Sequence, residues 1–209
     1  MKRRKEILFT LIITILFGMT AWAVEKTYQE PKVEYSADEY METEGSTMKS
    51  KIFRSPQKER REQVMEGMKQ VMISRMDKKV IWILMPDQKM YMEMMMQEGK
   101  AKEETVDLRD YKIEQSVIGQ EVVNGINTTK SKVTMTDPKR TRFEGFMWNT
   151  KDGIMVKMDT SAKAEGTKMR MKTELKNLKI EKQDPKLFEV PAGYKKMSMP
   201  AMPGMGGGY

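Results

Sequence analysis

The chain has 209 residues, 39% of them hydrophobic, and a formal net charge of +8, which allows one domain with flanking segments or two very small domains. Cysteine and histidine are both absent, so disulfides, thiol nucleophiles, Cys/His zinc sites, haem attachment and imidazole acid–base chemistry are excluded. Without cysteine the chain is also not expected to carry the lipid anchor of a lipoprotein.

The N-terminal segment has the features of an export signal. The basic start Met1–Lys5 precedes an apolar run of 11 residues, Ile7–Phe17, and Ala21-Trp22-Ala23 supplies the small residues that a signal peptidase recognises. We therefore predict a signal peptide over residues 1–23, cleavage after Ala23 and a periplasmic location. The alternative is an uncleaved anchor, because Ile7–Val24 is 18 residues without charge, the lower limit of a membrane span.

Cleavage would remove four of the 38 basic residues and one of the 30 acidic residues, leaving 34 against 29 and a net charge of +5. Charges of both signs are interspersed along the remainder, and no basic-aromatic patch stands out. Nucleic acid is therefore not an expected partner, whereas peripheral contact with an anionic membrane surface stays open.

After an exposed lead-in over residues 24–32, the chain changes to short alternating runs separated by turn residues. Runs about ten residues apart, joined by tight turns such as Glu66-Gly67 and Asn124-Gly125, are typical of an antiparallel meander. The predicted strands are Val33–Glu42, Ser46–Arg54, Glu62–Glu66, Met68–Met76, Lys79–Leu84, Gln88–Met96, Tyr111–Ile118, Lys130–Thr136, Thr141–Asn149, Gly153–Asp159, Thr167–Leu175 and Lys179–Lys182. The best helix candidate is Lys100–Arg109, with a charged loop as the alternative.

The most regular pattern is a row of methionines. Met90, Met92, Met94 and Met96 fall on one face at period two, opposite Lys89, Tyr91 and Glu93. Methionine is flexible and polarizable, which suits a surface that adapts to variable apolar partners. It also fills ordinary cores, and the period does not separate a packed core from a ligand cavity.

Several other strands are apolar on one face only, which predicts an antiparallel sheet that covers something on a single side. The strand Val80–Leu84 is apolar on both faces and is expected in a central position under a lid or the lead-in. Phe188 and Val190 are expected to form a terminal plug against the sheet. The residues expected to line an apolar cavity are Val71, Ile73, Trp82, Met90, Met92, Met94, Met96, Val133, Met135, Ile154, Val156, Met158, Met169 and Met171.

Three passages in order carry a resemblance to a known family: Met72–Pro86 with Lys89–Glu93, Gly119–Gly125 leading into Lys132-Val133-Thr134, and Pro185–Met197. The first has the cadence I-x-R-x-D-x-x-x-x-W-x-L-x-P-x-x-x-x-Y. Together they resemble the periplasmic outer-membrane lipoprotein carrier and receptor (Lol-type) superfamily, over about residues 33–197, and most closely a branch of exported domains with Met/Gly-rich tails.

The resemblance implies a mainly β fold, a strongly curved antiparallel half-barrel over residues 33–196, with at most one or two short helices. Its concave face would hold acyl chains or another apolar ligand. In such carriers an arginine at the position of Arg75 helps hold a lid closed. The alternative for Arg75 is a rim arginine paired with Asp77 or Glu93, because a buried arginine needs acceptors.

The expected function is that of a periplasmic carrier that shelters lipoprotein acyl chains or lipid, without a cofactor. The alternative is an envelope interaction module with a filled core and an envelope protein as partner. A third hypothesis is Cu(I) binding by the tail over residues 197–209, whose composition predicts disorder. Its Met197, Met199, Met202 and Met205 offer soft thioether ligands. No phosphate loop, activated serine or paired carboxylate indicates an enzyme.

Overall fold

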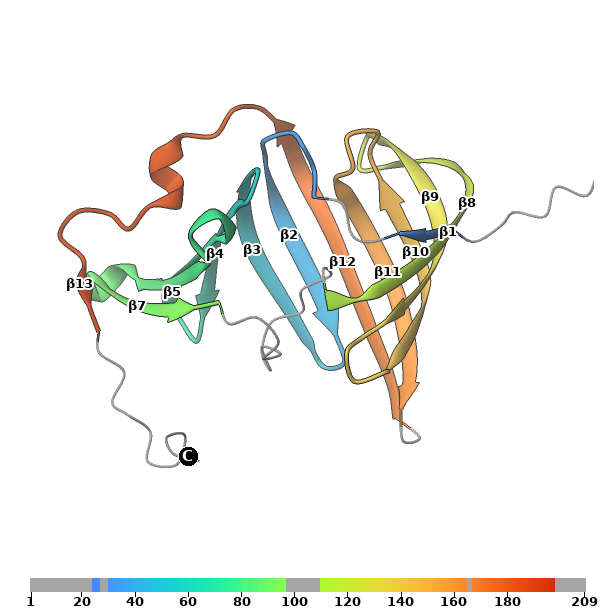
Figure 1. Cartoon of the computed structure of the whole chain (residues 1–209), viewed down its shortest axis with the longest axis horizontal. Coiled ribbons are helices and arrows are strands. Elements are labelled where there is room, and N and C mark those ends of the chain that lie inside the picture. The colour runs from blue at the N-terminus through green and yellow to red at the C-terminus, as the bar shows by residue number, and fades with distance from the viewer. Residues whose placement is uncertain (1–23, 27–29, 97–109, 165–166, 198–209) are drawn as a thin grey trace, which may run out of the picture.

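The computed structural model describes residues 24–26, 30–96, 110–164 and 167–197. They form one 13-stranded sheet, in the order β1-β8-β9-β10-β11-β12-β2-β3-β4-β5-β6-β7-β13 (Figure 1). The first group is β1 Val24–Lys26, β2 Tyr35–Thr43, β3 Ser46–Ser55, β4 Lys58–Met65, β5 Met68–Arg75, β6 Val80–Met85 and β7 Met90–Met95. The second is β8 Lys112–Val123, β9 Ile126–Thr136, β10 Arg142–Asn149, β11 Met155–Ala164, β12 Thr167–Ile180 and β13 Lys195–Lys196.

The predicted mainly β, antiparallel architecture is confirmed. Neighbouring strands pair antiparallel, with the parallel pair β13–β7 as the exception. The described residues contain no α-helix, only short 3-10 turns: η1 Met76–Lys78, η2 Pro86–Gln88 and η4 Pro185–Phe188. The helix candidate Lys100–Arg109 lies outside the described residues.

Two meanders, β2–β7 and β8–β12, join through the pairing of β12 with β2. The hairpin turns follow from residues that accept positive φ: Asn124 and Gly125 have φ of 51° and 77° between β8 and β9, as a type I′ turn requires. The predicted break after Leu175 is a bulge rather than a strand end. There Asn177 has a φ of 51° and the register with β2 shifts, so β12 continues to Ile180.

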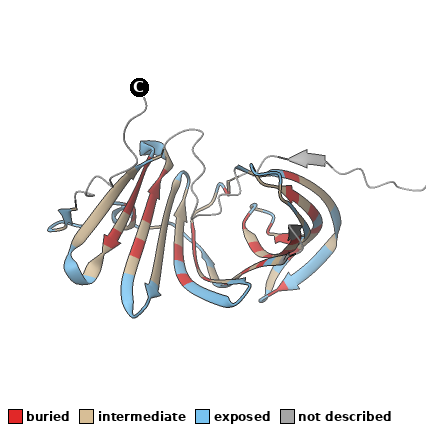
Figure 2. Ribbon diagram, turned by 90° about the horizontal axis from the view of Figure 1, so that it is seen from below, coloured by how far each residue is buried: buried red, intermediate tan, exposed pale blue. Residues whose placement is uncertain are grey.

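The expected strong curvature is corrected by the structure. The sheet is open, with β1 and β13 at its edges, and is not strongly curled as a whole. Its buried apolar residues form four clusters, and Figure 2 shows the buried residues distributed along the strands. Because the buried apolar residues of the described ranges divide into four clusters, they do not form one common core.

The strand predicted to be central, β6, lies close to the β13 edge instead. From the sequence, a lid or the lead-in is expected to cover this strand, but a different segment covers it. One face is covered by the C-terminal segment, where Phe188 packs with Trp82 and Leu84, and this confirms the predicted terminal plug. The other face continues a row of methionine and isoleucine side chains.

Candidate functional site

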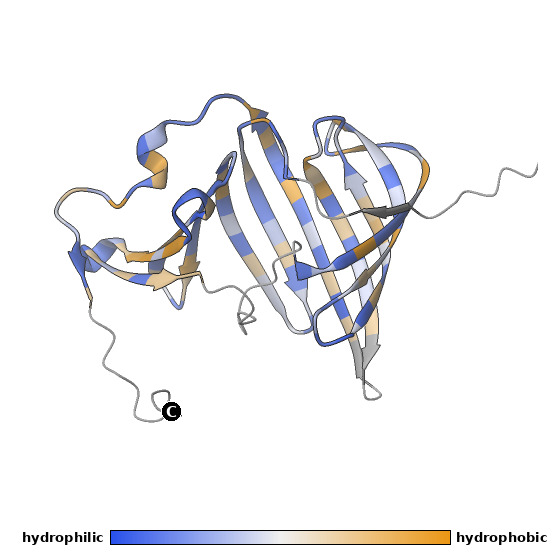
Figure 3. Cartoon of the chain, viewed as in Figure 1, coloured by the Kyte–Doolittle hydropathy of each residue, from blue (hydrophilic) through white to orange (hydrophobic). Residues whose placement is uncertain are grey.

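The cross-strand register divides the sheet into two faces with different chemistry. We define the methionine face as the side that carries Met72 on β5, Ile83 on β6 and Met92 on β7, which are consecutive cross-strand partners. The opposite side, which carries Ile73, Trp82 and Glu93 on the same strands, is called the lysine face for the residues described below. Figure 3 shows the alternation of polar and apolar residues along the strands.

On β6 and β7 the methionine face is apolar and only partly covered. Met90 opposes Met85, Met92 opposes Ile83 and Met94 opposes Ile81. Ile81 is buried, whereas the other five side chains of this group are half-buried. The predicted one-sided row of methionines is therefore present from Met90 to Met94, and it is continuous with β6.

Further methionines extend this face to the ends of two hairpins. Met41 opposes Met48 between β2 and β3, and Met65 opposes Met68 between β4 and β5. Met48, Met65 and Met68 have exposed fractions of 40%, 47% and 57%. This side of β2–β7 therefore presents thioethers to solvent across neighbouring strands.

The β8–β12 end of the sheet is instead filled with protein. Val133, Met135, Met158 and Met171 pack together with Ile113 and Met147 in one buried cluster, and Val133 and Met135 are fully buried. Ile154 belongs to a second cluster with Tyr35 and Leu175, and Val156 to a third with Trp148. Here the predicted cavity residues pack within protein clusters.

The structure does not bring all of the predicted cavity residues onto one face. Val71, Ile73 and Trp82 lie on the lysine face under the C-terminal segment, because Trp82 opposes Glu93 rather than a methionine. Met169 opposes Ala162 on the methionine face and is half-buried. Met96 follows β7, where its backbone N–H donates to the Lys79 carbonyl at 2.9 Å.

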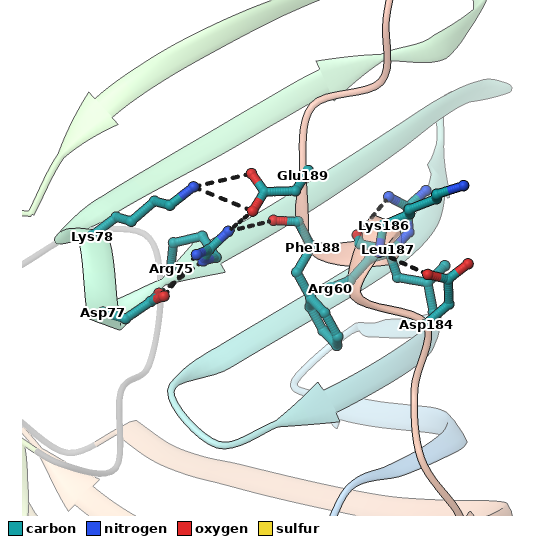
Figure 4. A network of polar contacts seen from close by, with 9 residues as sticks. All are labelled: Arg60, Arg75, Asp77, Lys78, Asp184, Lys186, Leu187, Phe188 and Glu189. Carbon is teal, nitrogen blue, oxygen red and sulfur yellow. Dashed lines mark hydrogen bonds and ion pairs between the residues drawn. The ribbon is translucent and has the colours of Figure 1, made fainter.

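Arg75 holds the C-terminal segment against the lysine face (Figure 4). Its side chain is 5% exposed. It donates to both carboxylate oxygens of Asp77, at 2.7 and 2.6 Å, to the Phe188 carbonyl at 3.1 Å and to Glu189. Burial disfavours the charged form of Glu189, but hydrogen bonds from Arg75 and Lys78 lower its pKa. Arg75 therefore does both things that the sequence offers as alternatives: it pairs with Asp77, and it binds a segment that covers the sheet.

Four further contacts lie within this segment, within the sheet below it, or between the two. Arg60 donates to the Leu187 carbonyl at 3.1 Å, and the Asp184 carboxylate accepts the Lys186 backbone N–H at 2.9 Å at the start of η4. At the sheet edge, Glu93 accepts the Trp82 indole N–H at 2.9 Å and pairs with Lys196 of β13 at 2.6 Å. The segment is therefore an integral cover of β5–β7.

A charged network that the sequence did not reveal crosses the methionine face at β2–β4. Glu59 pairs with Arg54 and with Arg61, the latter at 3.1 Å, and Arg61 also pairs with Glu39. Ser50 donates to Glu39 at 2.9 Å. Burial raises the pKa of Glu59, but the two arginines outweigh it and lower the pKa to about 2.

One shallow hollow of about 240 Å³ lies over β2–β4, and most of the residues that line it are charged. Its lining residues are Asp38, Glu39, Tyr40, Lys49, Ser50, Lys51 and Glu62. Within the described ranges, no group of three or more Asp or Glu residues is placed to hold a metal ion. Apart from Met197, the proposed copper ligands lie outside the described residues.

No helix in the described part of the chain is long and apolar enough to cross a bilayer. The fold and the two faces define a single open-sheet protein with a methionine-rich side and a C-terminal cover.

Residues 32–152 match the model of the family described as domain of unknown function DUF4412. This match covers more than half of the chain, and the protein belongs to that family.

Several solved structures are similar to this chain at low sequence identity. An uncharacterized conserved protein from Thermus thermophilus has a TM-score of 0.53 and 10% identity, over 79% of this chain and 90% of that one. MucB in the Pseudomonas aeruginosa MucA/MucB complex has a TM-score of 0.48 and 14% identity, over 78% of this chain and 57% of that one.

A domain assigned as an outer membrane lipoprotein-sorting protein from Vibrio parahaemolyticus has a TM-score of 0.34 and 12% identity. The match covers 77% of this chain and 91% of that one. No curated protein matches the sequence.

Proposed function

We propose that this protein is an exported, non-enzymatic binding protein that holds an apolar ligand against the methionine face of β5–β7 in the periplasm. The class of ligand is the acyl chain of a lipid or lipoprotein. The observation that carries the proposal is the half-buried apolar row of Met72, Ile83, Met92 and Met94 on three adjacent strands. The resemblance to lipoprotein carriers and the N-terminal export pattern support it.

The mechanism is desolvation. Each methylene moved from water onto an apolar surface contributes roughly 0.8 kcal/mol, so a bound acyl chain gains free energy in proportion to the length that is covered. Methionine side chains change rotamer readily and are polarizable, so such a surface fits chains of different shape. The charged network of Glu39, Arg54, Glu59 and Arg61 borders the row and offers polar contacts for a headgroup.

The second candidate is an envelope interaction module with a filled core. It is favoured by the cluster of Val133, Met135 and Met158, whose side chains pack against each other and leave 2% or less of each residue exposed. In this case the methionine face of β5–β7 would contact another protein, and no lipid would copurify.

The test uses protein purified from the periplasm of cells that express the full chain. Native mass spectrometry detects copurified lipid, and titration with the neutral fluorescent probe N-phenylnaphthylamine measures apolar binding. The double variant Met92→Gln/Met94→Gln should weaken probe binding by about tenfold or more, because two thioethers of the row become polar.

The matched control is Met95→Gln. Met95 lies on the same strand but opposes Val80 on the other face, with 65% of its surface exposed, so its replacement should leave probe binding unchanged. Absence of both lipid and probe binding in the natural protein would refute the acyl-chain proposal and favour the interaction module. Equal weakening by both variants would show that the probe binds elsewhere.

A further inference from the structure

The lysine face carries an aromatic ring between two ammonium groups at β9–β11. Trp148 on β10 has Lys130 of β9 and Lys157 of β11 as direct cross-strand partners. Their Nζ atoms lie 4.9 and 4.6 Å from the ring centroid. Phe146, two residues earlier and 38% exposed, has the Lys130 Nζ 5.1 Å from its ring.

The same arrangement recurs on β12, β2 and β3. The ring of Tyr40 on β2 has Lys49 Nζ at 5.5 Å and Lys176 Nζ at 4.7 Å from its centroid. Lys49 is the direct partner of Tyr40 on β3, and Lys51 lies 5.4 Å from the ring of Phe53 on that strand. Lysine side chains and aromatic rings thus alternate across this face.

The two groups belong to one row. Consecutive cross-strand partners run from Lys130 through Trp148, Lys157, Glu174 and Tyr40 to Lys49, on the neighbouring strands β9, β10, β11, β12, β2 and β3. With neighbouring strands about 4.8 Å apart, five steps span on the order of 24 Å. The row is extended, and only its last two members, Tyr40 and Lys49, line the hollow over β2–β4.

This face has an excess of unpaired positive charge. Acidic residues along it already have partners: Asp159 pairs with Arg170, Glu42 with Lys172, and Glu174 accepts a hydrogen bond from Asn124. By contrast, several face lysines form no ion pair within the described part of the chain. They include Lys49, Lys51, Lys132, Lys157 and Lys176.

We propose that the lysine face of β9–β12, β2 and β3 is a docking surface for an anionic membrane. Lysines near such a surface are attracted to its negative potential, and an amphipathic ring such as that of Tyr40 is favoured at the headgroup level. A compact anion would need donors that converge on one point, whereas the row extends over six strands and its lysines lie on β9, β11 and β3. This inference does not depend on the apolar ligand, because it concerns the opposite face.

Vesicle flotation tests the proposal with protein from cells that express the full chain. Vesicles of phosphatidylcholine with phosphatidylglycerol are compared with pure phosphatidylcholine vesicles, which give the baseline for any uncharged contact. The natural protein should bind the anionic vesicles more tightly, and the excess should disappear in high salt because the charges are screened.

The four-lysine variant replaces Lys49, Lys132, Lys157 and Lys176 with Gln. A loss of about fivefold is expected for each lysine that reaches the surface, so we expect at least about twentyfold weaker binding. The control variant has the same change in net charge, with Gln at the exposed Lys89, Lys139, Lys151 and Lys182, and should lose less than about threefold.

A variant with Arg at the four face positions keeps the charge and should bind like the natural protein, which separates loss of charge from loss of folding. Equal weakening by the face and control variants would overturn the proposal, since net charge alone would then explain binding. Failure of the natural protein to prefer anionic vesicles over phosphatidylcholine vesicles would also overturn the proposal. This holds even if soluble polyphosphate binds to the same lysines, because the face would then bind a free anion and not a membrane.

Discussion

Glu59 should make this protein lose stability in acid through one identifiable group. Its side chain is 13% exposed and lies between Arg54 and Arg61, and its pKa is about 2 in the folded protein against an ordinary value of 4.5. A depressed folded-state pKa stabilises the fold above the unfolded value, and this contribution falls as the pH drops from 4.5 toward 2. The difference corresponds to about 3 kcal/mol at pH 7.

The variant Glu59→Gln removes that titration. Urea unfolding at several pH values gives the free energy of unfolding for the natural protein and the variant. At neutral pH the variant should be less stable by about 3 kcal/mol or more, because two half-buried arginines lose a carboxylate. From pH 7 to pH 3 the natural protein should lose about 2 kcal/mol more than the variant, since only the natural protein has this group to protonate on unfolding.

The matched control is Glu144→Gln. Glu144 pairs with Arg142 on the surface, with side chains 56% and 63% exposed, and such exposed pairs contribute little to stability. Its pH curve should follow that of the natural protein. If the curves of the natural protein and Glu59→Gln ran parallel between pH 7 and pH 3, the assignment of a low pKa to Glu59 would be refuted.

Three further substitutions test the packing. Phe188→Ala should lower the free energy of unfolding by about 3–5 kcal/mol in urea titrations, because Phe188 is 1% exposed. Arg75→Met should lower the free energy of unfolding by about 1–3 kcal/mol. It should also speed tryptic cleavage of the C-terminal segment, because the natural Arg75 side chain binds the Phe188 carbonyl and the Glu189 carboxylate of that segment. Gly145→Ala should cost more than about 2 kcal/mol in the same titrations, because its Cβ would lie 2.0 Å from a backbone oxygen of β11. Gly119→Ala, with nothing within 4 Å of its Cβ, is the control.

The sequence predicted the strands well because their alternation and turn residues are local signals. The row from Met90 to Met94 lies on one face as the period of two requires, and Asn124-Gly125 forms the expected turn. The plug at Phe188 was also predictable, since an apolar residue between prolines must pack against something. These features need no knowledge of which strands are neighbours.

Features that depend on register were not predictable from the sequence. Val80–Leu84 is apolar on both faces, so its alternation could not say that Trp82 faces away from Met92. The charged network of Arg54, Glu59 and Arg61 and the row through Trp148 and Tyr40 form only after strands pair. Each of these strands taken alone is an ordinary polar-apolar run.

The opposite placement of the two proposed surfaces leads to a final prediction. Lys157 and Met158 are adjacent in the chain but belong to opposite sides of the sheet, as do Met94 and Met95 of β7, so a vesicle on the lysine face leaves the methionine face uncovered. N-phenylnaphthylamine, free in solution, and anionic vesicles should therefore bind without competition. Because the two surfaces share no side chain, the four-lysine variant should keep its affinity for the probe, and Met92→Gln/Met94→Gln should keep its affinity for vesicles. Fluorescence titration of the natural protein and of both variants, with and without vesicles and corrected for probe dissolved in lipid, measures the competition and the probe affinities, and vesicle flotation measures the vesicle affinities. Mutual displacement would show that lipid occupies the methionine face itself, and the protein would then dock through the site that holds the ligand.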